Sequence, residues 1–265
     1  MAPRGLLGFD GPILIGVVHL PALPGAPRPV PMDVVLDRAR ADARTWFESG
    51  ADAVLVENFG DAPFHPVRVP PVTVAAMARA IERVRSVATG PVGVNVLRND
   101  AESALGLCSA LELDFLRVNV HSGVTVTDQG LIEGRAHESL RRREEWPGHP
   151  LLLADLDVKH GRPLVSRPVG ALAEELIGRA GADALLLTGE GTGRPVDLEV
   201  LDELGRVVPE APVLLASGVD PDTVRATRNR VSGWIVGTWA KQGGKTLASL
   251  DPQRVAALST ARGRD

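Results

Sequence analysis

Polar side chains recur at every second position in several apolar segments of this sequence. Two segments contain such sets: Arg117, Asn119 and His121 in FLRVNVH, and Asp155, Asp157 and Lys159 in LADLDVKH. Asn95 in VGVNV and His19 in VVHL occupy equivalent positions. Because successive residues of a β-strand point to opposite faces, each set shares one face of its strand. We therefore predict that these polar groups converge on the same side of a common sheet.

Carboxylates beside a lysine and a histidine are suited to proton transfer. Lys159 and His160 lie where their strand is expected to end, and Asp155 and Asp157 would tune them. An amine beside two carboxylates stays protonated, so we favour an acid/base role over a Schiff base at Lys159. A buried ion-pair network with Arg117 and no chemistry is the alternative. The predicted catalytic residues are His19, Glu57, Asn95, Asn119, His121, Asp155, Asp157, Lys159 and His160.

Glycine-rich loops form a second group, in TGEGTGRP (188–195), ASGVDPDT and VGTW. Glycine lets backbone amides approach an anion, and the helix expected after Asp220-Pro221 would offer its N-terminus. The predicted phosphate-binding residues are Gly189, Gly191, Thr192, Gly193, Ser217, Gly218, Gly237 and Thr238. Neither the P-loop nor the Rossmann spacing is present, and each loop alone could be a tight turn.

Three histidines at strand ends raise the alternative of a metal site. His19, His121 and His160, with Glu57 or Asp155, have the donor types of a divalent-metal centre. No HExxH or paired CxxC motif occurs, however. We therefore predict no metal ligands and no cofactor, and keep a divalent metal as the alternative.

The segments that carry these residues alternate between strand and helix patterns. The expected strands are 13–20, 53–58, 92–97, 115–120, 151–158, 184–189, 213–218 and 234–238. The expected helices are 32–49, 73–88, 101–111, 135–145, 169–180, 197–206, 221–228 and 252–261. About eight βα repeats predict an α/β protein with one (β/α)₈ TIM barrel over residues 1–265, with phosphate-binding loops after the sixth to eighth strands. An open doubly wound sheet is the alternative.

Composition excludes several classes of protein. The net charge is −4 and no basic run occurs, so we expect no nucleic-acid partner. No stretch reaches the ~20 apolar residues of a membrane-spanning helix, and no signal peptide is visible, which predicts a cytoplasmic protein. Cys108, in the apolar stretch ALGLCSAL, is interpreted as a buried helical thiol. A homo-oligomer remains open.

The chain resembles the BtpA/SgcQ family over nearly its whole length. The resemblance rests on long motifs that occur in order, including GVVHLPALPGAP, FLRVNVHSGVTVTDQGLIEGRAHE, LLADLDVKHG and ADALLLTGEGTGRPVD. The resemblance implies a barrel of the ribulose-phosphate-binding type, in a family named for a role in cyanobacterial photosystem I biogenesis. Asp157-Val158-Lys159 is also similar to the start of the DxKxxD motif of orotidine monophosphate decarboxylase relatives. Arg162 stands at its last position, so that mechanism is not transferred.

Two hypotheses for function follow. The leading one is an enzyme that acts on a sugar-phosphate or nucleotide-like small molecule by acid/base chemistry, of the lyase, aldolase or isomerase type. The phosphate would bind at the glycine-rich loops, and the reacting carbon would lie near the charged strand ends. The alternative is a non-catalytic, BtpA-like assembly or stability factor for photosystem I.

Overall fold

The computed structural model describes residues 4–156, 158, 161–188 and 198–263. Within them, parallel strands close into a barrel in the order β1-β11-β10-β9-β7-β4-β3-β2. These strands are β1 (Ile13–His19), β2 (Ala53–Glu57), β3 (Val92–Asn95), β4 (Phe115–Val118), β7 (Leu151–Asp155), β9 (Ala184–Leu187), β10 (Val213–Leu215) and β11 (Gly233–Val236). The predicted TIM barrel is confirmed, and the closed order excludes the open doubly wound sheet.

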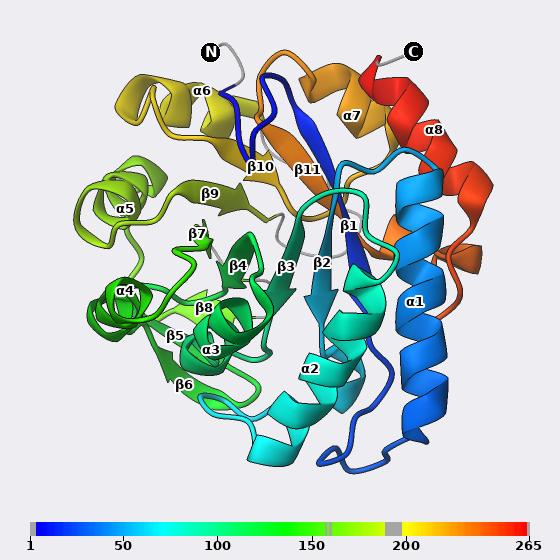
Figure 1. Ribbon diagram of the computed structural model, residues 1–265. Helices are drawn as coiled ribbons and strands as arrows, with labels where there is room; N and C mark the ends of the chain where they lie inside the picture. The colour runs from blue at the N-terminus through cyan, green and yellow to red at the C-terminus, as the bar shows by residue number, and fades with distance from the viewer. Residues whose placement is uncertain (1–3, 157, 159–160, 189–197, 264–265) are drawn as a thin grey trace.

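Helices surround the strands (Figure 1). They are α1 (Met32–Glu48), α2 (Pro71–Arg85), α3 (Ala101–Leu111), α4 (Ala136–Glu145), α5 (Val169–Glu174), α6 (Leu198–Val207), α7 (Pro221–Thr227) and α8 (Pro252–Arg262). The π-helix η2 (Glu175–Arg179) continues α5, and short 3₁₀ turns lie at η1 (Phe59–Asp61), η3 (Thr238–Ala240) and η4 (Gln242–Gly244). Asp220 caps α7: its carboxylate accepts a hydrogen bond from the Thr223 amide at 2.8 Å.

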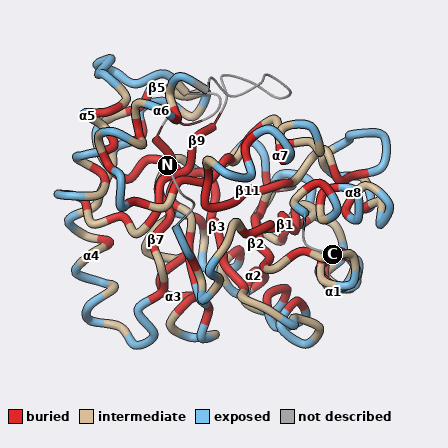
Figure 2. The backbone as a smooth tube through the Cα atoms, turned by 90° about the horizontal axis from the view of Figure 1, so that it is seen from above, coloured by how far each residue is buried: buried red, intermediate tan, exposed pale blue. Residues whose placement is uncertain are grey.

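Alternation along the strands divides the core into two layers. Leu116 and Val118 point outward and pack against the helices, whereas Phe115, Leu55 and Leu153 fill the lower lumen. Figure 2 shows that the buried residues lie at the centre of the molecule and that the exposed residues are concentrated on its periphery. Burial raises the pKa of the Cys108 thiol in α3, as expected for an inert buried cysteine.

A small antiparallel sheet, not predicted from the sequence, is inserted beside the mouth of the barrel. It contains β5 (Val124–Thr127), β6 (Gly130–Glu133) and β8 (Gly161–Pro163), in the order β6-β5-β8. The β5–β6 hairpin closes through Asp128–Gln129, with Gly130 at a φ of 97°. The insertion explains why β4 and β7 end sooner than expected: the chain leaves the barrel to form it.

The described helices include none that is both long enough and apolar enough to span a lipid bilayer.

Candidate active site

The upper layer of the lumen is charged rather than apolar. Arg117, at an inward position of β4, lies between two carboxylates. It donates hydrogen bonds to Asp155 through Nε and Nη2, at 2.9 and 3.0 Å, and to Glu57 Oε1 through Nη1, at 3.3 Å. Because every contact joins opposite charges, the barrel can hold these groups in its interior.

Two amides and a histidine complete this layer. Asn95 Nδ2 donates to Glu57 Oε1 at 3.0 Å, and Asn119 Nδ2 donates to Asp155 Oδ2 at 2.9 Å. His19 Nε2 lies 3.8 Å from Glu57 Oε2, since β1 and β2 pair these two residues directly. We call the six residues the lumen cluster: His19, Glu57, Asn95, Arg117, Asn119 and Asp155. The structure thus brings together five of the predicted catalytic residues around Arg117.

The electrostatics of the lumen cluster depend on its arginine. Burial disfavours the charged guanidinium of Arg117, but the adjacent carboxylates of Asp155 and Glu57 outweigh burial and raise its pKa. Arg98, which follows the end of β3, is buried, and there burial prevails over the attraction of Asp155 and lowers the pKa of the guanidinium. Sequence reasoning missed Arg98, because it follows the end of β3 and no strand alternation identifies it.

His121 does not join the lumen cluster. Strand β4 ends at Val118, so the alternation that would place His121 beside Arg117 and Asn119 no longer applies. Its Nε2 instead lies 2.8 Å from the Ala180 carbonyl oxygen, between the barrel wall and the end of η2. Burial lowers the pKa of this imidazole. The prediction of a common face is therefore correct for Arg117 and Asn119 and wrong for His121.

The ends of β10 and β11 lie side by side, as the phosphate hypothesis requires. Ser217 is buried, and its hydroxyl has no hydrogen-bond partner within the described part of the chain. Gly218 follows with a φ of 65°, a conformation that favours glycine. A Cβ on Gly237 would lie 2.5 Å from Cε1 of His19, so only glycine leaves room for that ring. Thr238 shares a hydrogen bond of 3.0 Å with the Thr246 hydroxyl.

The remaining predicted site residues lie outside the described residues. They are Asp157, Lys159, His160, Gly189, Gly191, Thr192 and Gly193. Among the residues that are described, no group of three or more histidine, cysteine, aspartate or glutamate side chains is arranged to hold a metal ion.

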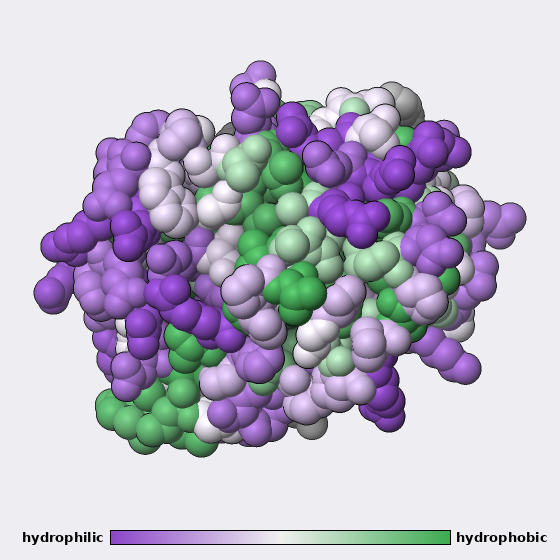
Figure 3. Space-filling model, turned by 60° about the horizontal axis from the view of Figure 1, so that its bottom comes forward, coloured by the Kyte–Doolittle hydropathy of each residue, from purple (hydrophilic) through white to green (hydrophobic). Residues whose placement is uncertain are grey.

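A cavity of about 770 Å³ opens beside the lumen cluster. Asn119 and Asp155 form its inner wall, and the inserted sheet, α5 and η2 enclose the rest. Figure 3, which brings this end of the barrel forward, shows apolar surface among the polar side chains around the mouth. Sequence reasoning missed the cavity because it missed the inserted sheet, although the alternation in VTVT followed by a two-residue loop is a hairpin signal.

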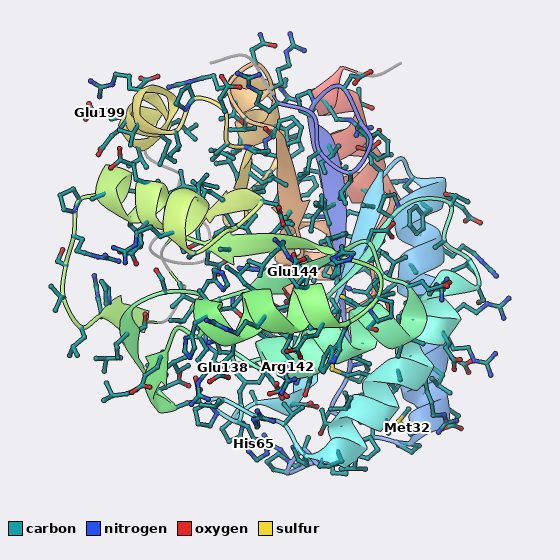
Figure 4. All side chains as sticks on the ribbon, turned by 60° about the vertical axis from the view of Figure 1, so that its left-hand side comes forward. Met32, His65, Glu138, Arg142, Glu144 and Glu199 are labelled. Atoms are coloured by element: carbon teal, nitrogen blue, oxygen red, sulfur yellow. The ribbon has the colours of Figure 1, made fainter. Side chains whose placement is uncertain are left out.

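Depressions over the charged helices are smaller than this cavity: the one lined by Arg79, Glu82 and Arg83 of α2 has a volume of about 210 Å³. Glu138 and Arg142 lie on the outside of α4 (Figure 4), and the depression that they share with Glu102 has a volume of only about 30 Å³. That is the space of about one water molecule. The mouth of the barrel is therefore the main candidate for ligand binding in the described structure.

Comparison with known proteins identifies relatives over more than nine-tenths of the chain. The photosystem I biogenesis protein BtpA of Synechocystis is 42% identical over 249 residues, which cover 94% of this chain and 87% of that protein. An uncharacterized protein of Pyrococcus horikoshii is 40% identical over 95% of this chain and 96% of its own length.

Solved structures share the barrel at low sequence identity. Tryptophan synthase of Mycobacterium tuberculosis aligns over 100% of both chains with a TM-score of 0.62 and 18% identity. N-(5'-phosphoribosyl)anthranilate isomerase of Pyrococcus furiosus aligns over 95% of this chain and 98% of that chain, with a TM-score of 0.56 and 15% identity. These likenesses show the fold. The BtpA family matches residues 11–263, and the chain belongs to that family.

Proposed function

We propose that the mouth of the barrel is the active site of an enzyme that acts on a phosphorylated small molecule by proton transfer, as a lyase, aldolase or isomerase. The observation that carries this proposal is the lumen cluster itself. Barrels of this kind normally fill their interior with apolar branched side chains, and enzymes of this fold act at the C-terminal ends of the strands. Here that end holds two buried carboxylates, an arginine and two amides.

The phosphate would bind where β10 and β11 end. The Ser217 hydroxyl is available as a donor, and the backbone at Gly218, where φ is positive, lets an anion approach closely. Phosphate sites of this fold are frequently built from the corresponding two loops. The P. furiosus isomerase, whose name describes a phosphoribosyl compound, is a structural neighbour that agrees with this class of ligand.

Proton transfer would take place beside the phosphate, at the ends of β1, β2 and β7. Lys159 and His160 follow Asp155 closely in the sequence, and we propose them as proton carriers on that ground. Within the lumen cluster, the contact of His19 with Glu57 is a second acid/base pair. A bound phosphate would fix the reacting carbon over the lumen cluster.

A thermal-shift screen of phosphorylated metabolites tests the proposal. We expect at least one compound to raise the melting temperature more than inorganic phosphate does. Gly218→Ala should abolish that response. Gly130→Ala is the matched control, since Gly130 also has a positive φ but lies at the tip of the β5–β6 hairpin. If no phosphorylated compound stabilises the protein, or if Gly218→Ala responds like wild type, phosphate binding at this site is refuted.

Once a substrate is known, turnover by Lys159→Met and by Glu57→Gln tests the chemistry separately from binding. Each variant should bind the substrate and convert it about 100-fold more slowly or worse, the usual contribution of a positioned acid or base. Unchanged turnover would remove that residue from the mechanism.

The relationship to the Synechocystis protein supports a second candidate function. That relative is named for photosystem I biogenesis and is 42% identical to this chain over 249 residues. This chain would then be a non-catalytic assembly or stability factor. Complementation of a cyanobacterium that lacks BtpA distinguishes the two: full rescue by the Glu57→Gln variant favours assembly, and rescue by the wild type alone favours chemistry.

A further inference from the structure

Two side chains that are more than nine-tenths buried line the cavity beside the lumen cluster, and each has one hydrogen-bonding atom without a partner among the described residues. Asn119 and His121 both line it, and their side chains are 4% and 1% exposed. Neither Asn119 Oδ1 nor His121 Nδ1 has a hydrogen-bond partner in the described structure. Leaving a buried polar atom unpaired is costly, so two such atoms at one cavity indicate a ligand that completes them.

Both atoms are hydrogen-bond acceptors. The Asn119 amide nitrogen donates to Asp155, which fixes its oxygen as the free end. For His121, the partner of Nε2 is the Ala180 carbonyl, which can only accept, so Nε2 carries the proton. Burial keeps the ring neutral, and Nδ1 is therefore an unprotonated acceptor. A ligand that satisfies this pair must supply N–H or O–H donors.

The rest of the cavity wall is apolar for its larger part, and its charged residues include Arg167, which donates to Glu175 at 2.5 Å. The wall includes Leu156, Val158, Leu172, Leu176, Leu187 and Val200. An aliphatic chain would leave both acceptors unpaired, and an apolar wall disfavours a free sugar, which carries hydroxyl groups on every side. A flat heterocycle with one or two N–H groups fits both requirements. The volume of about 770 Å³ is within the usual range for small-molecule sites.

We infer that this cavity binds a planar nitrogen heterocycle of the nucleobase type, as one end of the phosphorylated substrate. The inference rests on the proposed function, which places the phosphate at β10 and β11. The cavity and the proposed phosphate site are neighbours, because only β9 lies between β7 and β10 in the barrel. Thr188, just after β9, also lines the cavity. The ligand class is thus nucleotide-like: a phosphate, a linking group that crosses the lumen cluster, and a base under the inserted sheet.

Binding of nucleoside 5'-monophosphates, measured by calorimetry, tests the inference. The probes are adenosine, guanosine, cytidine and uridine 5'-monophosphates, each compared with its nucleoside and with ribose 5-phosphate. At least one monophosphate should bind about tenfold tighter than ribose 5-phosphate. Leu172→Trp, which fills the cavity from α5, should weaken it by about tenfold or more. Leu131→Trp is the control, since Leu131 is exposed on β6 and outside the cavity wall.

A second readout needs no variant. Nitrogen-15 spectra of the wild type report the His121 ring, and the monophosphate that binds should shift the Nδ1 resonance as it donates to that atom. An unmoved resonance on saturation would contradict the assigned contact even if binding is seen.

The outcomes separate this inference from the proposed function. Equal affinity for ribose 5-phosphate and every monophosphate, unchanged by Leu172→Trp, overturns the base site and leaves the phosphate site standing. Nucleosides that bind as tightly as their monophosphates, and are blocked by Leu172→Trp, support the base site and remove the phosphate. No binding by any probe means that water alone fills the cavity, which refutes the inference.

Discussion

Arg117 and Asp155 form a two-point contact inside the barrel: Nε bonds to Oδ1 at 2.9 Å and Nη2 to Oδ2 at 3.0 Å. The same guanidinium reaches Glu57 at 3.3 Å. One cation therefore compensates two buried carboxylates that come from different strands. Stability of the barrel and charge of the candidate site depend on the same side chain.

Replacing that cation should strongly destabilise the fold. Arg117→Met leaves Asp155 and Glu57 buried without their counter-charge, and we expect the free energy of unfolding to fall by about 3–5 kcal/mol in urea titrations. Arg85→Met, which removes an exposed contact of 3.6 Å with Glu112, is the control and should cost under about 1 kcal/mol. Equal stability of both variants would contradict a charged lumen cluster.

The lumen cluster also shows where sequence reasoning succeeds. Strand alternation placed Arg117, Asn119 and Asp155 on one face because a period of two is fixed by backbone geometry. It failed for His121, since nothing in FLRVNVH marks the end of β4 at Val118. Contacts between neighbouring strands, such as that of His19 with Glu57, depend on the register of the two strands, which a single sequence does not contain.

The small inserted sheet was missed for a different reason. Its β5–β6 hairpin has the right alternation but an Asp128–Gln129 loop, without the Asn-Gly or Asp-Gly pair that favours a tight hairpin turn. The third strand, β8, is only three residues long and comes from a distant part of the chain. Without this sheet the cavity and its two unpaired acceptors could not be anticipated.

Ser217→Ala should separate ligand binding from stability. The buried hydroxyl has no partner among the described residues, so its removal should leave the free energy of unfolding unchanged or raise it slightly. The thermal shift caused by a phosphorylated ligand should decrease. Ser139→Ala is the matched control, since that buried hydroxyl donates to the Arg135 carbonyl at 3.2 Å and its loss should cost about 1 kcal/mol. If Ser217→Ala lowers the free energy of unfolding as much as Ser139→Ala does, the Ser217 hydroxyl has a hydrogen-bond partner and the prediction is wrong.

A second buried ion pair predicts an asymmetric response. Lys241 is fully buried, and its Nζ lies 2.6 Å from Asp42 Oδ2, while Arg38 Nε donates to Asp42 Oδ1 at 2.9 Å. Asp42→Asn leaves Lys241 buried without a counter-charge and should cost about 3–5 kcal/mol. Lys241→Met should cost less, because Asp42 keeps Arg38. Chemical denaturation of both variants checks the order, and the reverse order would show that Arg38 does not compensate Asp42.

The neutral state of His121 predicts a pH dependence of stability. Burial lowers its pKa below the ordinary value of 6.5, and Arg143 acts in the same direction, against the Ala180 hydrogen bond and Asp183. Between the lowered folded value and the unfolded value near 6.5, the unfolded chain binds more protons. The stability that the neutral His121 ring contributes is therefore complete above pH 6.5, and it decreases as the pH falls toward the pKa of the folded state. His121→Gln should flatten this decrease in urea titrations between about pH 5 and 7.

His137→Gln, at an exposed histidine of α4, is the control and should leave the dependence of stability on pH as in wild type. Identical slopes for wild type and the His121 variant would show that this ring is not held neutral, and the acceptor assigned to the cavity would fail with it.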